Sequence, residues 1–162
     1  MEIPGLDLDK IVETIISVRH QSVLDGIDDD TERKAKEREL IDYYTSGSTG
    51  AVLKREIKRI TKALETVEQT LVCLQASITL LPIPPTIPQV IVGGGATAVP
   101  NPAWAEPFIA AVKQSLLSTC YMMEFLLLDV ENACESIDFA IPEIVETFKT
   151  NVNTYKISIN AL

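Results

Sequence analysis

Apolar side chains in the middle of the chain recur at spacings that alternate between four and three residues, first over 53–81 and again over 109–137. The first run consists of Leu53, Ile57, Ile60, Leu64, Val67, Leu71, Leu74, Ile78 and Leu81. The second consists of Ile109, Val112, Leu116, Thr119, Met123, Leu126, Val130, Ala133 and Ile137. This heptad pattern is typical of a helix that buries a narrow stripe against another helix. Each run therefore predicts a long helix that needs a partner helix.

The two runs predict an antiparallel helical hairpin that resembles a coiled coil. The first helix is basic near its start, at Lys54, Arg55, Lys58, Arg59 and Lys62. The second is acidic near its end, at Asp129, Glu131, Glu135 and Asp138. Folding the second helix back on the first brings these charges together. Exposed ion pairs contribute at most about 1 kcal/mol each, so we expect them to set orientation more than stability.

Shorter helices are predicted on the N-terminal side of the hairpin. Asp7 can cap a helix that carries Leu8, Ile11, Ile15 and Val18 on one face and ends near residues 24–26. A second helix is predicted over 31–44, after an acidic run that favours the positive end of the helix dipole. Apolar residues are sparse there, so it should be mostly exposed. Residues 46–50 read as a turn.

The second long helix must break or kink near Pro142, which has no backbone donor and disfavours helical geometry at Ile141. A shorter helix is predicted next, with Ile144, Val145 and Phe148 on one side. The last residues, from Tyr155 to Asn160, alternate apolar and polar side chains. This alternation fits a strand lent to a neighbour's sheet edge, and equally a fraying helix end.

The predicted fold class is therefore all-α, in three parts. Residues 1–50 hold the N-terminal helices and an acidic linker, 51–140 the hairpin, and 141–162 a short helix and a tail. The hairpin includes an extended, proline- and glycine-rich loop at its tip, over 82–105.

The loop is unusual because it lacks charge. No acidic or basic side chain occurs from Gln69 to Ala105, and seven of the nine prolines lie between Pro82 and Pro107. The prolines predict extended, polyproline-type backbone, and Gly93, Gly94 and Gly95 allow a reversal. A tight helical connection needs only a few residues. An apolar loop of this size exceeds what two helices can cover, so we expect it to bind a partner.

The candidate partner-binding residues are the apolar positions of the loop and of the tail. They are Pro82, Ile83, Pro84, Pro85, Ile87, Pro88, Val90, Ile91, Val92, Trp104, Tyr155, Ile157 and Ile159. One alternative is that the loop folds back over its own helices. Another is insertion of the loop into a membrane, which is disfavoured because the prolines fall where a spanning helix needs donors, and unpaired backbone groups are costly in lipid.

The formal net charge of −9 argues against a nucleic-acid binder, because neutralising phosphates requires clustered Lys and Arg. The negative charge also argues against a protein that binds an anionic membrane surface. The basic run on the first long helix is interpreted as a solvated helix face.

Candidate catalytic and metal-binding residues are few. His20 is the single histidine, so a Ser/His, Cys/His or multi-histidine site cannot form within one chain. The acids Asp28, Asp29 and Asp30 lack the spacing of a calcium loop and fit helix capping. Glu131 and Glu135 lie one turn apart, on what we expect to be a solvated face. We expect no enzymatic activity, no cofactor and no metal.

The three cysteines, Cys73, Cys120 and Cys134, are too far apart for a zinc or disulfide framework, and we expect reduced, buried thiols. The N-terminal residues do not form a signal peptide, so synthesis in a cytoplasm is expected.

The segment Leu80-Leu81-Pro82-Ile83-Pro84-Pro85-Thr86-Ile87-Pro88, followed by Gly93-Gly94-Gly95 and a second apolar helix, resembles a connection between long helices in virion proteins of tailed bacteriophages. The resemblance implies a structural component of the particle, in the tail or baseplate, assembled in the host cytoplasm. It implies several copies in contact with other structural proteins. The alternatives are a membrane-active helical protein that inserts the loop and a small cytoplasmic adaptor.

Overall fold

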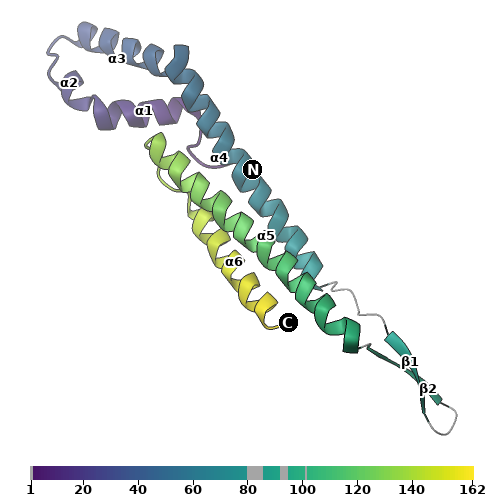
Figure 1. Ribbon diagram of the computed structural model, residues 1–162. Coiled ribbons are helices and arrows are strands. Elements are labelled where there is room, and N and C mark those ends of the chain that lie inside the picture. Colours follow the sequence, from purple (N-terminus) through teal and green to yellow (C-terminus); the bar gives the residue numbers. More distant parts are fainter. Residues whose placement is uncertain (1, 80–85, 92–94, 101) are drawn as a thin grey trace.

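The computed structural model of the protein describes residues 2–79, 86–91, 95–100 and 102–162, with side chains at 2–79 and 106–162. Six helices and two short strands lie in these residues, in the order α1–α4, β1, β2, α5, α6. The helices form an elongated body, and the strands lie beyond one end of it (Figure 1). The predicted all-α class is confirmed for the body.

Two long helices dominate the body, as predicted. Helix α4 spans Gly47–Thr79 and α5 spans Pro102–Ser136, and they pack along each other in opposite directions (Figure 1). The first predicted stripe is buried at Leu53, Ile60, Leu64, Val67, Leu71 and Leu74, and partly buried at Ile57 and Ile78. Leu81 lies outside the described residues. The heptad register of α4 is therefore confirmed.

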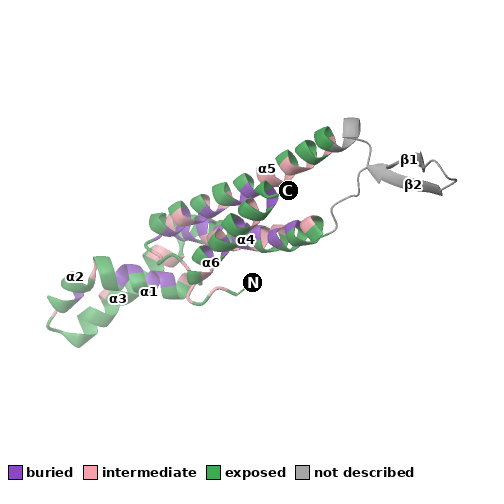
Figure 2. Cartoon of the chain, turned by 90° about the horizontal axis from the view of Figure 1, so that it is seen from below, coloured by how far each residue is buried: buried purple, intermediate pink, exposed green. Residues whose placement is uncertain are grey.

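Helix α5 buries a wider face than the predicted stripe. Met123, Val130, Ala133 and Ile137 are buried as expected, whereas Ile109 is exposed. Cys120, Leu127 and Cys134 are also buried, although they lie outside the stripe. The reason is a third helix, α6 (Glu143–Asn160), which packs against both α5 and α4. The body is thus a three-helix arrangement, in which α5 is covered on two sides (Figure 2).

The chain turns between α5 and α6 close to the predicted break. Asp138 takes a left-handed conformation with φ 52°, and Pro142 precedes the first residue of α6 with extended backbone. Helix α6 then continues through the whole tail to Asn160. The strand alternative for the tail is therefore wrong. Ile159 supplies the physical reason, because it is 0% exposed in the chain's own core and holds the end of α6 in place.

The N-terminal helices pack at the start of α4. Helix α1 spans Leu8–Arg19, α2 spans Gln21–Asp25 and α3 spans Asp30–Thr45. The predicted caps are present: Asp7 accepts a hydrogen bond from the Lys10 amide at 3.0 Å, and Asp29 accepts from the Thr31 and Glu32 amides at 2.8 and 2.9 Å.

The buried faces of these helices follow the prediction only in part. Helix α3 contributes no fully buried side chain, as expected from its composition. In α1, Ile11 and Ile15 are buried, but Val12 and Ile16 are buried with them and Val18 is 70% exposed. The expected turn over 46–50 is much shorter, because α4 already begins at Gly47.

Two glycines make this tight junction possible. Gly47 has φ +68°, a conformation that disfavours a side chain, and a Cβ at Gly50 would lie 2.3 Å from the Thr45 carbonyl oxygen. The chain therefore passes from α3 into α4 through Ser46 alone.

The segment between α4 and α5 carries a two-stranded antiparallel pairing. Strand β1 (Thr86–Ile91) pairs with β2 (Gly95–Pro100), with Thr86 opposite Pro100 and Ile91 opposite Gly95. The backbone is extended, as expected from the prolines, but it is paired with itself rather than free polyproline-type chain. The chain direction reverses between Ile91 and Gly95, as the glycines suggested. A two-stranded hairpin alone is marginally stable in water.

Candidate functional site

The predicted partner-binding residues of the loop lie in or next to the strands. Ile87, Pro88, Val90 and Ile91 belong to β1, and Trp104 belongs to the first turn of α5, all without described side chains. The others lie outside the described residues: Pro82, Ile83, Pro84, Pro85 and Val92. Strand β1, with Ile87, Pro88, Val90 and Ile91, lies beyond the end of the helical body that is opposite α1–α3 (Figure 1).

Of the three predicted residues of the tail, Tyr155 and Ile159 lie one turn apart on the inner face of α6, and Ile157 lies on the other side. Ile159 is buried, Tyr155 is partly buried against the core, and Ile157 is 64% exposed. Because a helix separates neighbouring residues by about 100°, the tail cannot present all three to one partner. Ile157 alone keeps most of its side chain free for an external contact.

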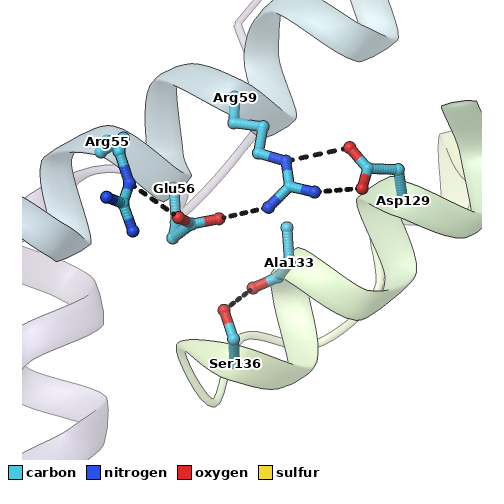
Figure 3. Close-up of polar contacts among 6 residues, drawn as sticks. All are labelled: Arg55, Glu56, Arg59, Asp129, Ala133 and Ser136. Atoms are coloured by element: carbon cyan, nitrogen blue, oxygen red, sulfur yellow. Dashed lines mark hydrogen bonds and ion pairs between the residues drawn. The ribbon is translucent and has the colours of Figure 1, made fainter.

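A cluster of charged residues joins α4 to α5 (Figure 3). The guanidinium of Arg59 donates from Nε to Asp129 Oδ2 at 2.9 Å, and a second nitrogen donates to Asp129 Oδ1. Its remaining nitrogen donates to Glu56 at 3.1 Å, and Arg55 donates to the other oxygen of Glu56, also at 3.1 Å. Glu56 is buried, so the two arginines compensate a charge that is removed from water.

This cluster has the chemistry of a structural clamp. The hydrogen bonds that Arg59 donates to Asp129, and then to Glu56, raise the pKa of Arg59 above its usual value and keep the guanidinium charged. Both carboxylates in the cluster accept hydrogen bonds from arginines of the same chain. A general acid or base needs a proton that it can exchange near the working pH, which this arrangement disfavours.

Other acidic residues, in α5 and in the turn that follows it, pair with elements that the sequence did not indicate. Glu131 accepts from Lys149 on α6 at 2.5 Å, and Asp138 forms an ion pair with Arg19 on α1. Only Asp129, among the four acids proposed to face the basic start of α4, makes such a pair in the described part of the chain. The predicted pairing of basic with acidic residues is thus present, but the acidic residues pair with cations on three different helices.

Helix α6 is held on α5 by three lysine contacts. Lys149 bridges Glu131 and Glu146, Lys156 donates to Glu124 at 2.8 Å, and Lys113 donates to the Asn160 carbonyl oxygen at 2.9 Å. These carboxylates raise the pKa of Lys149 and of Lys156 through hydrogen bonds. Lys156 also lies over the ring of Tyr121, 4.5 Å from its centre.

His20 has a polar partner on another helix. Its Nε2 lies 2.9 Å from the hydroxyl of Tyr44, so it links the junction of α1 and α2 to α3. The imidazole is partly buried and connects helices.

The three thiols differ in exposure. Cys120 and Cys134 are buried as expected, but Cys73 is exposed on α4, which corrects that prediction. Burial raises the pKa of Cys134 to about 11, with a further increase from nearby Glu131, and burial also raises the pKa of Cys120. A buried, protonated thiol is a poor nucleophile and a poor metal ligand.

Within the described residues, no three His, Cys, Asp or Glu side chains are placed to hold a metal ion together. None of the described helices combines the length and the apolar character of a membrane span.

An open apolar cleft lies between the N-terminal residues Ile3 and Pro4 and the turn from α5 to α6 at Phe139 and Pro142. Its lining is mostly apolar, with Glu2 and Glu143 at its edge.

One surface of α5 was missed by sequence reasoning. Seven exposed positions follow a second spacing of three and four residues, on the side of α5 away from α4 and α6: Ala111, Gln114, Ser118, Tyr121, Phe125, Leu128 and Asn132. We call this set the outer stripe of α5. The same spacing was available in the sequence, but the stronger apolar stripe nearby concealed it.

Comparisons with protein families, with curated proteins and with solved structures find no match. The function is therefore argued from the chain itself.

Proposed function

We propose that this chain is a structural component of a viral particle, a tail or baseplate protein of a tailed bacteriophage, that docks to neighbouring subunits through its uncharged loop. The observation that carries the proposal is the absence of any acidic or basic side chain from Gln69 to Ala105. The resemblance of residues 80–88 and 93–95 to a connection in virion proteins supplies the type of assembly.

The position of the loop supports docking. Helix α6 ends at Asn160, beside Lys113, so the last turns of α4 and the first turns of α5 extend past it (Figure 1). Ile109, an exposed apolar side chain, lies on these first turns of α5. The paired strands lie farther out, and a lone two-stranded hairpin gains stability when another surface covers it.

The body of the protein fits the role of a strut. Three packed helices and the Arg59–Asp129 clamp form a rod between the N-terminal helices and the far ends of α4 and α5. Nothing in the charged clusters requires a substrate, because their carboxylates are matched by cations of the same chain.

The test is incorporation into particles. In a phage that encodes the chain, its gene is disrupted and complemented with the wild type, with Ile87→Asp, or with Val18→Asp as a control. The chain in purified particles is then measured by quantitative mass spectrometry. We expect Ile87→Asp to be depleted, with an unchanged helical circular-dichroism signal, and Val18→Asp to be retained because Val18 is exposed on α1.

Absence of the wild-type chain from purified particles would refute the proposal, and normal incorporation of Ile87→Asp would refute docking through the loop. Flotation of the purified protein with neutral lipid vesicles tests the membrane-active alternative, which predicts binding without any partner protein. The adaptor alternative predicts that Trp104, the single tryptophan, is shielded from acrylamide in the isolated protein. The docking proposal predicts shielding only in the particle.

A further inference from the structure

The outer stripe of α5 has the spacing of a helix–helix seam and no helix to cover it. Its seven members follow intervals of three and four residues over three heptads, and all of them are exposed. Such a seam is the usual signature of a coiled-coil contact. The opposite side of α5 already packs against α4 and α6, so the outer stripe is available for a helix from outside the chain.

The stripe is suited to burial. It contains no charged residue, and two acids beside it, Glu124 and Asp129, are paired with Lys156 and Arg59 of the same chain. The next position of the same spacing after Asn132 is the exposed Glu135, at the C-terminal end of the helix. The hydroxyl of Ser118 donates to the Gln114 carbonyl oxygen at 2.9 Å, so its burial leaves no unsatisfied donor. Lys156 fixes the ring of Tyr121 from one side.

Charge favours a second copy as the occupant. The chain has a net charge of −9, so two copies repel each other wherever their acidic surfaces approach. A face whose own members carry no charge reduces this repulsion where the copies meet. A basic partner would gain nothing from such a face.

The sizes of the side chains favour one orientation. The N-terminal half of the stripe has the smaller members Ala111, Gln114 and Ser118, and the C-terminal half has the larger members Tyr121, Phe125 and Leu128. In an antiparallel pair, Leu128 meets Ala111 of the second copy, Phe125 meets Gln114 and Tyr121 meets Ser118. Each large side chain then faces a smaller one, whereas a parallel pair places large against large.

We propose that the outer stripe of α5 is a self-complementary interface, through which two copies of the chain pair with their α5 helices antiparallel. The inference goes beyond the docking function and does not depend on it, because the stripe and the loop are separate surfaces.

The area of the interface determines how tightly two copies are expected to bind. The stripe from Ala111 to Asn132 is about 32 Å long. Tyr121 and Phe125 are both more than half exposed, and such aromatic side chains bury about 150–250 Å² each when fully covered. One helix pair of this length lies near the lower limit of specific interfaces, about 1,200 Å² in total. We therefore expect a reversible dimer that forms at micromolar or higher concentration.

The first experiment measures mass against concentration by sedimentation equilibrium with the purified full-length chain. We expect the wild type to pass from monomer to dimer, and Phe125→Glu to remain a monomer. Val18→Glu is the matched control, because Val18 is 70% exposed and Phe125 69%, and it should dimerise like the wild type. Because Phe125 is exposed, the variant should keep its helical circular-dichroism signal. A monomeric wild type at every concentration, or a dimer unaffected by Phe125→Glu, would overturn the proposal.

The second experiment tests orientation by the distance between spin labels. Asn132→Cys in a Cys73→Ser background places one label at the end of the stripe, since Cys120 and Cys134 are buried. Antiparallel pairing centred between Ser118 and Tyr121 predicts about 40 Å between the labels of a dimer, and parallel pairing about 10 Å. The shorter distance would overturn the antiparallel arrangement. Ile87→Asp should leave both measurements unchanged, which separates this interface from docking by the loop.

Discussion

Arg59 on α4 and Asp129 on α5 form a two-pronged hydrogen-bonded ion pair that fixes the long helices against each other. They are 70 positions apart in the sequence. The planar guanidinium matches the carboxylate with two parallel bonds and has a third nitrogen left for Glu56. One side chain therefore joins two helices and also compensates a buried acid.

This geometry predicts that Arg59→Lys is more harmful than Asp129→Asn. Lysine cannot reproduce the two-pronged bond while also reaching Glu56, so Arg59→Lys weakens two contacts where Asp129→Asn weakens one. Both variants should lower the midpoint of thermal unfolding measured by circular dichroism. Lys58→Gln, on the same helix, is the control, because Lys58 makes no ion pair with the side chains of α5 that the structure describes. Equal midpoints for Arg59→Lys and Lys58→Gln would show that the clamp contributes nothing measurable.

The core of the long helix pair is tested by Leu64→Ala. Leu64 is fully buried, and truncating such a side chain costs about 2–5 kcal/mol through lost burial and the cavity that remains. Val72→Ala, on the exposed side of the same helix, should change the free energy of unfolding by less than about 0.5 kcal/mol. Urea unfolding gives both values. A Leu64→Ala curve that superimposes on the wild type would contradict the packing of α4.

The packing of α6 on the rest of the chain is tested at two isoleucines that lie two residues apart. Ile159→Ala should cost about 2–5 kcal/mol, because the side chain is fully buried near the end of the helix. Ile157→Ala should be nearly neutral, since that side chain is largely exposed. Urea unfolding of the two variants provides the comparison. If Ile157→Ala were the more harmful change, the end of α6 would be rotated from the face described above.

The thiols give a prediction about pH. The pKa of Cys134 is about 11 in the folded protein because burial disfavours the thiolate, and unfolding returns it to about 9. The folded state therefore holds the proton more tightly, and this contribution to stability is complete below about pH 9 and is lost as the pH rises towards 11. Unfolding measured in urea between these pH values should show a smaller loss of stability for Cys134→Ala than for the wild type.

A reactivity assay checks the same point directly. With a thiol reagent near pH 8, Cys73 should react at once, whereas Cys120 and Cys134 should react only after denaturant is added. Rapid reaction of all three thiols in the native protein would contradict the burial of α5 between its neighbours.

Local pattern was sufficient to predict much of the fold. The stripe of α4 could be read residue by residue, because a long helix needs one narrow apolar face to pair with another. The caps at Asp7 and Asp29 were equally readable, since a short side chain before a helix has few other partners for its oxygen. The exposure of α3 followed from its composition.

Contacts between distant segments could not be predicted from the local pattern of residues. The tail from Tyr155 to Asn160 has a pattern that suits a strand or a helix, and only the space beside α5 decides for the helix that buries Ile159. The same packing explains Cys120, Leu127 and Cys134, whose burial depends on α6 rather than on the stripe to which they are adjacent.

The sequence by itself determined the long helices, their apolar seam, their caps and the uncharged segment between them, because each depends on residues within a few turns of one another. The tertiary structure decided which helix covers which face, how the acids of α5 divide between α1, α4 and α6, and which stripe of α5 is left uncovered. These outcomes depend on which distant segment fills a given space, and a linear pattern of apolar and polar residues does not specify its partner.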